Sequence, residues 1–161
     1  MKTTTNEHSV GVVPASLFLA IVQLLVGLGV WFLSPLPVIA IITSVGYAAW
    51  CLFVAHWDVL FGGGKGFFQR ILILTLWQLP ALITGTWAML TFFGLAPRCD
   101  IGVVVLQIWL EPFAPLWSLL PGIMIHGRGL YLWFLCLLPW ILVIGLAFFA
   151  QRNARKKSQC L

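Results

Sequence analysis

The sequence predicts an all-α integral membrane protein, a polytopic helical bundle that forms a single membrane domain over residues 1–161. Its composition predicts this class, because 61% of the residues are hydrophobic, 8% are charged and the mean hydropathy is +1.05. The apolar residues also gather in long blocks, and a helix needs about 20 apolar residues to cross roughly 30 Å of hydrocarbon. Strands of a membrane barrel would instead alternate apolar and polar residues over segments of about 10.

The first two predicted transmembrane helices cover residues 12–33 and 36–57, and a short turn at Ser34 and Pro35 separates them. A cleaved signal peptide has a shorter apolar core and a cleavage site between small residues. The first block ends instead in large apolar residues before the turn. We therefore interpret it as a retained anchor helix.

The other two predicted transmembrane helices cover residues 71–94 and 130–150. A glycine-rich run at 62–66 precedes the first of these. It lacks the Gly-Lys-Ser/Thr ending of a phosphate-binding loop, so we interpret it as a turn. A basic tail at 151–161 follows the last helix, and its Lys and Arg side chains are expected to attract anionic lipid headgroups.

The remaining apolar segment, residues 101–125, fits a transmembrane helix poorly. It contains Glu111, and a carboxylate at the centre of a span costs on the order of 3 kcal/mol. Pro112 and Pro115 interrupt the helical hydrogen bonds directly after it. The sequence thus favours four spanning helices plus a Pro-broken re-entrant or interfacial segment. Five spans stay open as an alternative, because residues 101–106 are strongly hydrophobic.

The distribution of basic residues predicts the orientation, since cytoplasmic loops carry the excess of Lys and Arg. The four basic residues in 151–161 place the C-terminus in the cytoplasm of an inner membrane. With four spans, Lys2, Lys65 and Arg70 join them inside, against only Arg98 and Arg128 outside. A fifth span would divide the basic residues almost evenly, which favours the four-span arrangement.

Two glutamines within the apolar blocks are candidates for polar contacts between helices. Gln23 in the first helix and Gln78 in the third each lie on a stripe of small residues that recurs at helical spacing. Such stripes favour close helix packing in membranes. An amide facing lipid would lack a hydrogen-bond partner, so we expect Gln23 and Gln78 to bond across helices. A polar lining for a solute path is the alternative.

The tryptophans are expected to divide between the membrane interfaces and the bundle interior. Those expected at the interfaces, near block ends or within the Pro-broken segment, are Trp31, Trp57, Trp109, Trp117 and Trp133. Those expected to pack deeper are Trp50, Trp77, Trp87 and Trp140.

One set of ionisable residues is a candidate functional polar cluster on the outer side of the four-helix arrangement. Its members are Arg98, Asp100, Glu111, His126 and Arg128. Ionisable groups near the membrane are candidates for function, and a carboxylate beside an arginine can bind a cation, relay a proton or hold a polar headgroup. The alternative is structural, in which Glu111 pairs with Arg98 or Arg128 to lower the cost of its burial.

No catalytic residue, cofactor site or metal site is predicted. The four cysteines, Cys51, Cys99, Cys136 and Cys160, form no C-x-x-C pair. The net charge of +5 reflects topology, so no nucleic-acid partner is expected.

The expected function is a non-catalytic subunit or partner of a larger membrane assembly, with other membrane subunits or copies of itself as partners. A small transporter or channel with an outer polar vestibule around Glu111 is the alternative. An enzyme acting on lipid headgroups is a third class, and it would need the same outer cluster for acid–base chemistry.

Overall fold

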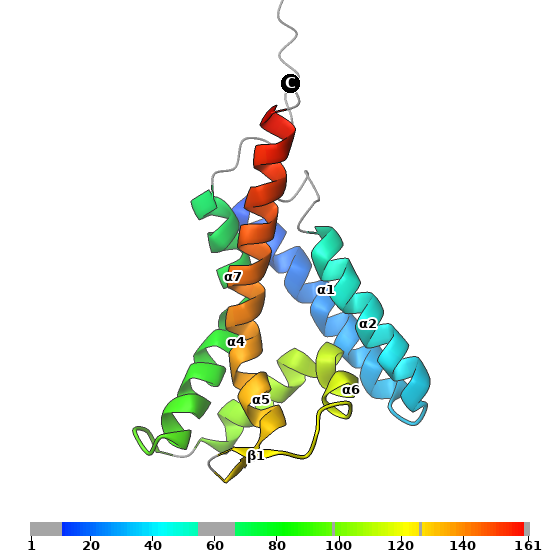
Figure 1. Cartoon of the computed structure of the whole chain (residues 1–161), viewed down its shortest axis with the longest axis vertical. Coiled ribbons are helices and arrows are strands. Elements are labelled where there is room, and N and C mark those ends of the chain that lie inside the picture. The colour runs from blue at the N-terminus through cyan, green and yellow to red at the C-terminus, as the bar shows by residue number, and fades with distance from the viewer. Residues whose placement is uncertain (1–10, 55–66, 98, 126, 160–161) are drawn as a thin grey trace, which may run out of the picture.

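The chain folds into a bundle of apolar helices, and the computed structural model describes residues 11–54, 67–97, 99–125 and 127–159 (Figure 1). The structure is 83% helical, which confirms the predicted all-α class. Within the described residues, five helical segments are long and apolar enough to cross a membrane, and the fourth of them is the broken stretch Asp100–Trp117 taken as a whole. Some residues named above lie outside the described part, namely Lys2, Lys65, Cys160 and the glycine run at 62–66. The side chains of residues 150 and 153–159 lie outside it as well.

Helices α1 (Val12–Leu33) and α2 (Pro37–Val54) form an antiparallel hairpin. α1 has the same bounds as the first predicted helix. α2 begins at a proline, which suits the first helical position because the missing N–H would have no partner there. Residues 55–57 of the second predicted helix, Trp57 among them, lie outside the described residues.

Helices α4 (Phe67–Phe92) and α7 (Leu130–Gln159) form the most extensive helix pair in the structure. α4 begins before the predicted residue 71 and ends before the predicted residue 94. Gly94 explains this end, because its φ of +72° is the left-handed conformation that stops a helix. α7 continues past the predicted residue 150, so residues 151–159 of the predicted basic tail are helical.

The ambiguous segment folds as three short pieces, α5 (Asp100–Leu110), a 3₁₀ turn η1 (Glu111–Phe113) and α6 (Ala114–Trp117). Eleven residues at 1.5 Å each make α5 only about 16 Å long. Pro112 ends the regular helix, since it has no N–H to donate, whereas Pro115 lies in the first turn of α6, where the missing N–H needs no partner. A two-stranded antiparallel hairpin follows, β1 (Met124–Ile125) and β2 (Arg128–Gly129).

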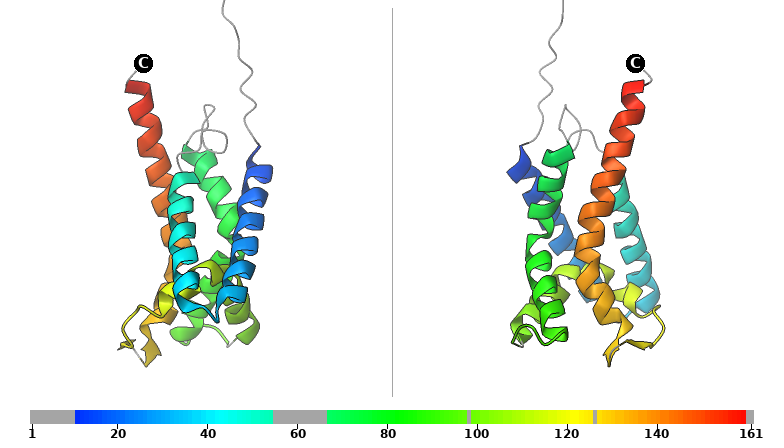
Figure 2. Two further views of the ribbon diagram at one scale, coloured as in Figure 1. Left: turned by 90° about the vertical axis from the view of Figure 1, so that its right-hand side faces the viewer. Right: turned by 60° about the vertical axis from the view of Figure 1, so that its left-hand side comes forward.

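The views agree that α5 starts at the end of the bundle that carries the β-hairpin and rises toward the middle (Figure 2). The chain then returns through α6 to the same end, from which α7 crosses the full length of the bundle. α5 packs mainly on α4, while η1 packs on α1 and α6 packs on α2. The broken segment therefore joins the α1–α2 hairpin to the α4–α7 pair.

The core gathers buried side chains from α1, α2, α4, α5 and α7, most of them on α4 and α7. Leu19, Ile73 and Leu106 are fully buried there. The outer faces of the same helices expose large apolar side chains, for example Ile21, Ile83 and Ile101. A bundle that is apolar both inside and outside is what a lipid environment requires.

Candidate functional site

The centre of the bundle holds a cluster of interlocked polar side chains. Gln23 on α1 and Gln78 on α4 are both 0% exposed, and Gln78 Nε2 donates a hydrogen bond of 3.0 Å to Gln23 Oε1. The structure thus brings the two predicted glutamines into direct contact. Two buried amides that bond to one another avoid the cost of an unsatisfied polar group in an apolar medium.

Two further helices contribute to this cluster. The Tyr47 hydroxyl on α2 donates to Gln23 Oε1 at 3.3 Å, and the Trp109 indole N–H on α5 donates to Gln78 Oε1 at 3.2 Å. Gln23 Nε2 in turn donates to the Trp109 carbonyl oxygen at 2.5 Å. Gln23, Tyr47, Gln78 and Trp109 are called the amide cluster below, and they link four helices.

The Trp109 carbonyl is available to Gln23 because of the proline that follows it. In a 3₁₀ turn a carbonyl accepts from the residue three positions later. Pro112 is three positions after Trp109 and has no N–H. The side chain of Gln23 therefore supplies the donor that the local backbone lacks.

A groove of about 360 Å³ lies beside this cluster, between α1 and the end of α5. Its lining, called the Glu111 groove below, is Leu24, Gly27, Leu28, Trp31, Ile108 and Glu111. The apolar side chains of this lining are 45–61% exposed. The groove therefore lies on the outer surface of the bundle, and a single carboxylate interrupts its apolar lining.

Gly27 allows η1 to approach α1 closely at this groove. A Cβ atom at Gly27 would lie 3.2 Å from Pro112 Cδ and 3.4 Å from Glu111 Cβ. Pro112 is itself buried. The backbone that carries Glu111 is thus seated directly against α1 and has little freedom to move.

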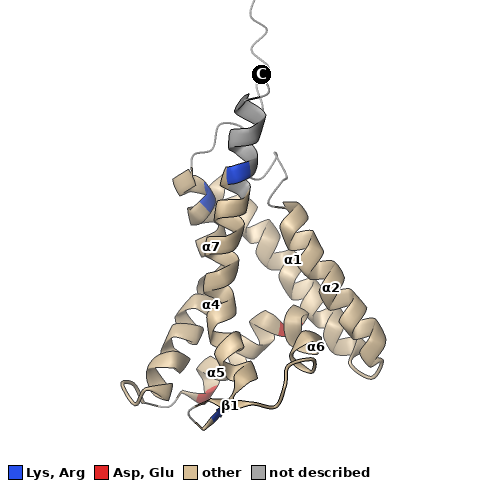
Figure 3. Ribbon diagram, in the orientation of Figure 1, with Lys and Arg blue, Asp and Glu red and all other residues tan. Residues whose placement is uncertain are grey.

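The structure separates the members of the candidate polar cluster. Asp100 is exposed at the first position of α5, whereas Glu111 follows its last residue, about 16 Å further along the helix. Figure 3 shows the two acidic positions well apart, with the basic position of β2 near the start of α5. Arg98 and His126 lie outside the described residues.

Arg128 has an aromatic neighbour in place of a carboxylate. Its guanidinium carbon lies 5.2 Å from the centroid of the Phe92 ring, which is within the range of a cation–π interaction. No ion pair forms between acidic and basic side chains in the part of the chain that the structure describes. Of the two pairs in the structural alternative, the Glu111–Arg128 pair is therefore not present, whereas Arg98 lies outside the described residues. The Glu111 side chain lines the groove.

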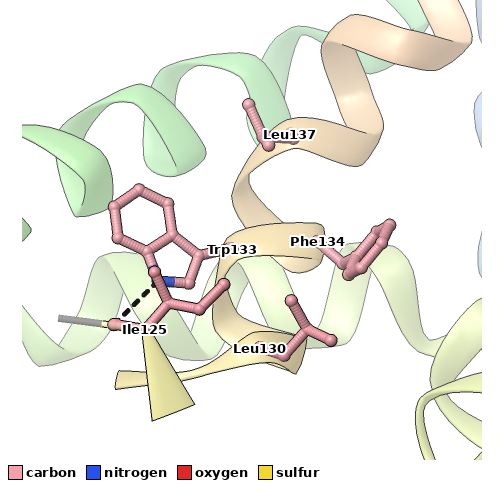
Figure 4. A pocket seen from close by; sticks show the side chains of 5 residues that line it. All are labelled: Ile125, Leu130, Trp133, Phe134 and Leu137. Atoms are coloured by element: carbon pink, nitrogen blue, oxygen red, sulfur yellow. Dashed lines mark hydrogen bonds between the residues drawn. The ribbon is translucent and has the colours of Figure 1, made fainter. Parts of the chain in front are cut away.

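A second pocket, of about 420 Å³, lies where β1 meets α7 (Figure 4). Its lining is apolar apart from the Trp133 indole, which donates to the Ile125 carbonyl oxygen at 3.3 Å. That bond occupies the polar atom of the indole. The pocket offers an apolar surface without a group to recognise a polar ligand.

Metal and thiol chemistry find no support among the described residues. No three His, Cys, Asp or Glu side chains gather there closely enough to hold a metal ion. Cys51 and Cys136 are buried on different helices, and Cys99 is exposed.

Sequence reasoning missed two members of the amide cluster. Trp109 was expected at an interface, but its N–H reaches Gln78 inside the bundle. Tyr47 is the other missed member, and it carried a usable signal, because a phenol within an apolar helix needs a hydrogen-bond partner.

Two tryptophans outside the amide cluster also differ from the prediction. Trp87 and Trp140 were expected to pack inside, yet both are more than 40% exposed.

Comparison of the chain with protein-family models, with curated proteins and with solved structures finds no match.

Proposed function

We propose that this chain is a multi-pass protein of the inner membrane in which α1, α2, α4 and α7 span the bilayer and α5–α6 is re-entrant. The length of α5 supports this topology, because about 16 Å covers only half of a hydrocarbon core of roughly 30 Å. The return of the chain to the end where it entered supports it as well (Figure 2). Pro112 and Phe113 in the break are buried, and the Trp109 carbonyl before them accepts from Gln23, in keeping with the need to cover irregular backbone within a membrane.

The C-terminus is cytoplasmic in this proposal. Arg70 lies in the first turn of α4 and Arg152 near the end of α7, so both are at the end of the bundle opposite the β-hairpin (Figure 3). The positive-inside rule assigns that end to the cytoplasm. Asp100 and the β-hairpin then face the outer side (Figure 3).

The function that we propose is that of a non-catalytic subunit or partner within a larger membrane assembly. One observation carries this proposal, an unused packing face on α2. Gly46 is exposed with no atom within 4 Å of where its Cβ would be, and Ala49 is exposed one turn further on. Ile42 and Phe53, 65% and 64% exposed, extend the same face.

Small residues on a membrane helix favour association when another helix packs closely against them. In lipid no hydrophobic force drives helices together, so association depends on backbones that approach closely at glycine and alanine. The glycines of the bundle that serve this purpose, Gly27 and Gly85, have neighbours within about 3.2 Å. Gly46 offers an equivalent notch that this chain leaves empty, and a helix of another subunit fits it.

The amide cluster argues against a channel through the bundle. A water-filled path would expose its polar lining, whereas Gln23 and Gln78 are fully buried and bond to one another. The Glu111 groove opens on the outer surface and does not lead through the centre. The transporter or channel alternative therefore has less support than the subunit proposal.

Site-specific crosslinking in membranes tests the proposal. A photoreactive residue at Ala49 should give a crosslink to a second polypeptide, and Gly46→Leu should abolish it by filling the notch. Gly29→Leu is the matched control, because Gly29 on α1 also has no atom within 4 Å and should leave the crosslink intact. A chain that gives no crosslink from Ala49 and migrates alone in mild detergent would contradict the proposal.

A further inference from the structure

We propose that the Glu111 groove binds an amphiphile with an ammonium head and an apolar tail, drawn from the surrounding bilayer. The proposal is independent of the α2 face, since the groove lies between α1 and α5. Glu111 is the carboxylate in the otherwise apolar lining of this groove, and the ammonium head is the group proposed to bind it.

The head group follows from two different features of the same groove. The Glu111 carboxylate makes no hydrogen bond or ion pair with any other described residue, and a carboxylate in apolar surroundings requires a cation or a donor. Trp31 lines the groove as well, and the face of an indole attracts an ammonium ion. A carboxylate together with an indole is a recognition set for ammonium and disfavours an anionic head.

The tail follows from the shape and position of the lining. Leu24, Leu28 and Ile108 are about half exposed, so they meet the acyl chains of the bilayer directly. The groove extends along α1 from Leu24 to Trp31, and seven residues at 1.5 Å each make about 10 Å. Its volume of about 360 Å³ lies within the range of about 300–1,000 Å³ that is typical of small-molecule sites.

The groove is held in place by the packing beneath it. Gly27 admits Pro112 and Glu111 against α1, and the bond from Gln23 to the Trp109 carbonyl fixes the end of α5. A carboxylate on a fixed backbone loses little conformational freedom on binding, which favours affinity. Glu111 lies beside Gly27, and Trp31 is one helical turn further along α1, so both groups line the part of the groove that would hold the head.

Photoaffinity labelling of the full chain in maltoside micelles tests this proposal, because that detergent carries no ammonium group. The probe is an alkyltrimethylammonium with a diazirine in its chain, and labelled peptides are mapped by mass spectrometry. A probe with the same chain and a neutral diol head is the matched control. We expect the cationic probe to label the peptides that contain Leu24–Trp31 and Ile108 about tenfold more than the neutral probe.

Variants separate the head-group contact from simple partition. Glu111→Gln should lower labelling of these peptides about tenfold, and Trp31→Leu should lower it severalfold. Asp100→Asn removes a carboxylate of the same charge at the other end of α5 and should leave labelling unchanged.

Three results would overturn the proposal. The first is equal labelling by the cationic and neutral probes, which is measured on the native chain and does not depend on whether a variant folds. The second is native labelling in Glu111→Gln. The third is a native chain that runs as a dimer and is not labelled in the groove, which would assign the surface to a second copy of this chain.

Discussion

Gln78 Nε2 lies 3.0 Å from Gln23 Oε1, and this contact joins the centres of α1 and α4. Tyr47 and Trp109 bond to the same two amides, so α2 and α5 are tied to the contact as well. Helices α1, α2, α4 and α5 pack on one another mainly through apolar side chains, and this one group of hydrogen bonds connects all four. A cluster of this kind specifies which helix faces meet, since any other rotation would leave buried amides unsatisfied.

Replacing Gln23 with leucine should destabilise the fold. Gln23 accepts from Tyr47 and Gln78 and donates to the Trp109 carbonyl, so the change leaves two donors and one acceptor without partners inside the bundle. Hydrogen bonds between membrane helices contribute about 0.6 kcal/mol on average and up to roughly 1.7. We expect a loss of about 2 kcal/mol in the free energy of unfolding, measured by denaturation with sodium dodecyl sulfate in mixed micelles.

Two further variants calibrate that result. Tyr47→Phe removes only the 3.3 Å bond and should cost less than about 1 kcal/mol. The double variant of Gln23→Leu with Gln78→Leu should be more stable than the sum of the single changes predicts, because neither amide is then stranded. Additive single effects would contradict the cluster.

Gly85 on α4 should not tolerate a larger residue. A Cβ there would lie 3.2 Å from the carbonyl oxygen of Cys136 on α7, and a backbone atom cannot move aside as a side-chain end can. Gly85→Val should therefore destabilise the α4–α7 pair by about 1–3 kcal/mol, as overpacking in a core does. Gly145→Ala is the control, since no atom lies within 4 Å of that position and alanine favours a helix over glycine. Equal stability of the two variants would contradict the packing described.

Arg128 should stabilise the outer end of the bundle through the ring of Phe92. The guanidinium lies 5.2 Å from the ring centroid, and exposed cation–π pairs contribute about 0.5–1 kcal/mol. Arg128→Gln should lower the free energy of unfolding by that amount, and Phe92→Leu should make the same change nearly neutral. If Arg128→Gln costs as much in the Phe92→Leu background as in the native chain, the ring is not its partner.

The number and approximate positions of the long helices could be predicted from the sequence because long apolar blocks mark them. α1 begins at Val12 and ends at Leu33, where the apolar block begins and ends. The limits of α4 and α7 were harder to predict, since a helix extends beyond its apolar block when the next residues are still compatible with a helix. Phe67 and Gln159 are such cases, and no change in hydrophobicity marks them.

The site could be predicted only in part, because contacts between distant segments leave little trace in one sequence. Gln23 and Gln78 were identified since an amide within an apolar helix needs a partner. The use of the Trp109 carbonyl depends on how the break at Pro112 is seated against α1, which no local pattern reveals. The position of Glu111 on the groove, away from Asp100, depends on the direction in which α5 runs. This direction could not be predicted from the sequence either.

Residues 99 and 122 should be accessible from the same side of the membrane. Cys99 is exposed just before α5, and Gly122 is exposed after α6. Because we propose that α5–α6 is re-entrant, an impermeant maleimide should label Cys99 and, in a Cys99→Ser background, the thiol of Gly122→Cys in right-side-out vesicles. Cys51, Cys136 and Cys160 are replaced by alanine for this experiment.

Arg152→Cys serves as the inside control, since Arg152 is exposed near the end of α7 and should react only after the vesicles are opened. Labelling of positions 99 and 122 from opposite sides would show that the broken segment crosses. The number of spanning segments would then be five. Labelling of both positions only from the inside would still indicate a re-entrant segment, but the orientation of the chain would be the reverse of the one proposed. The positive-inside rule would then not hold for this chain.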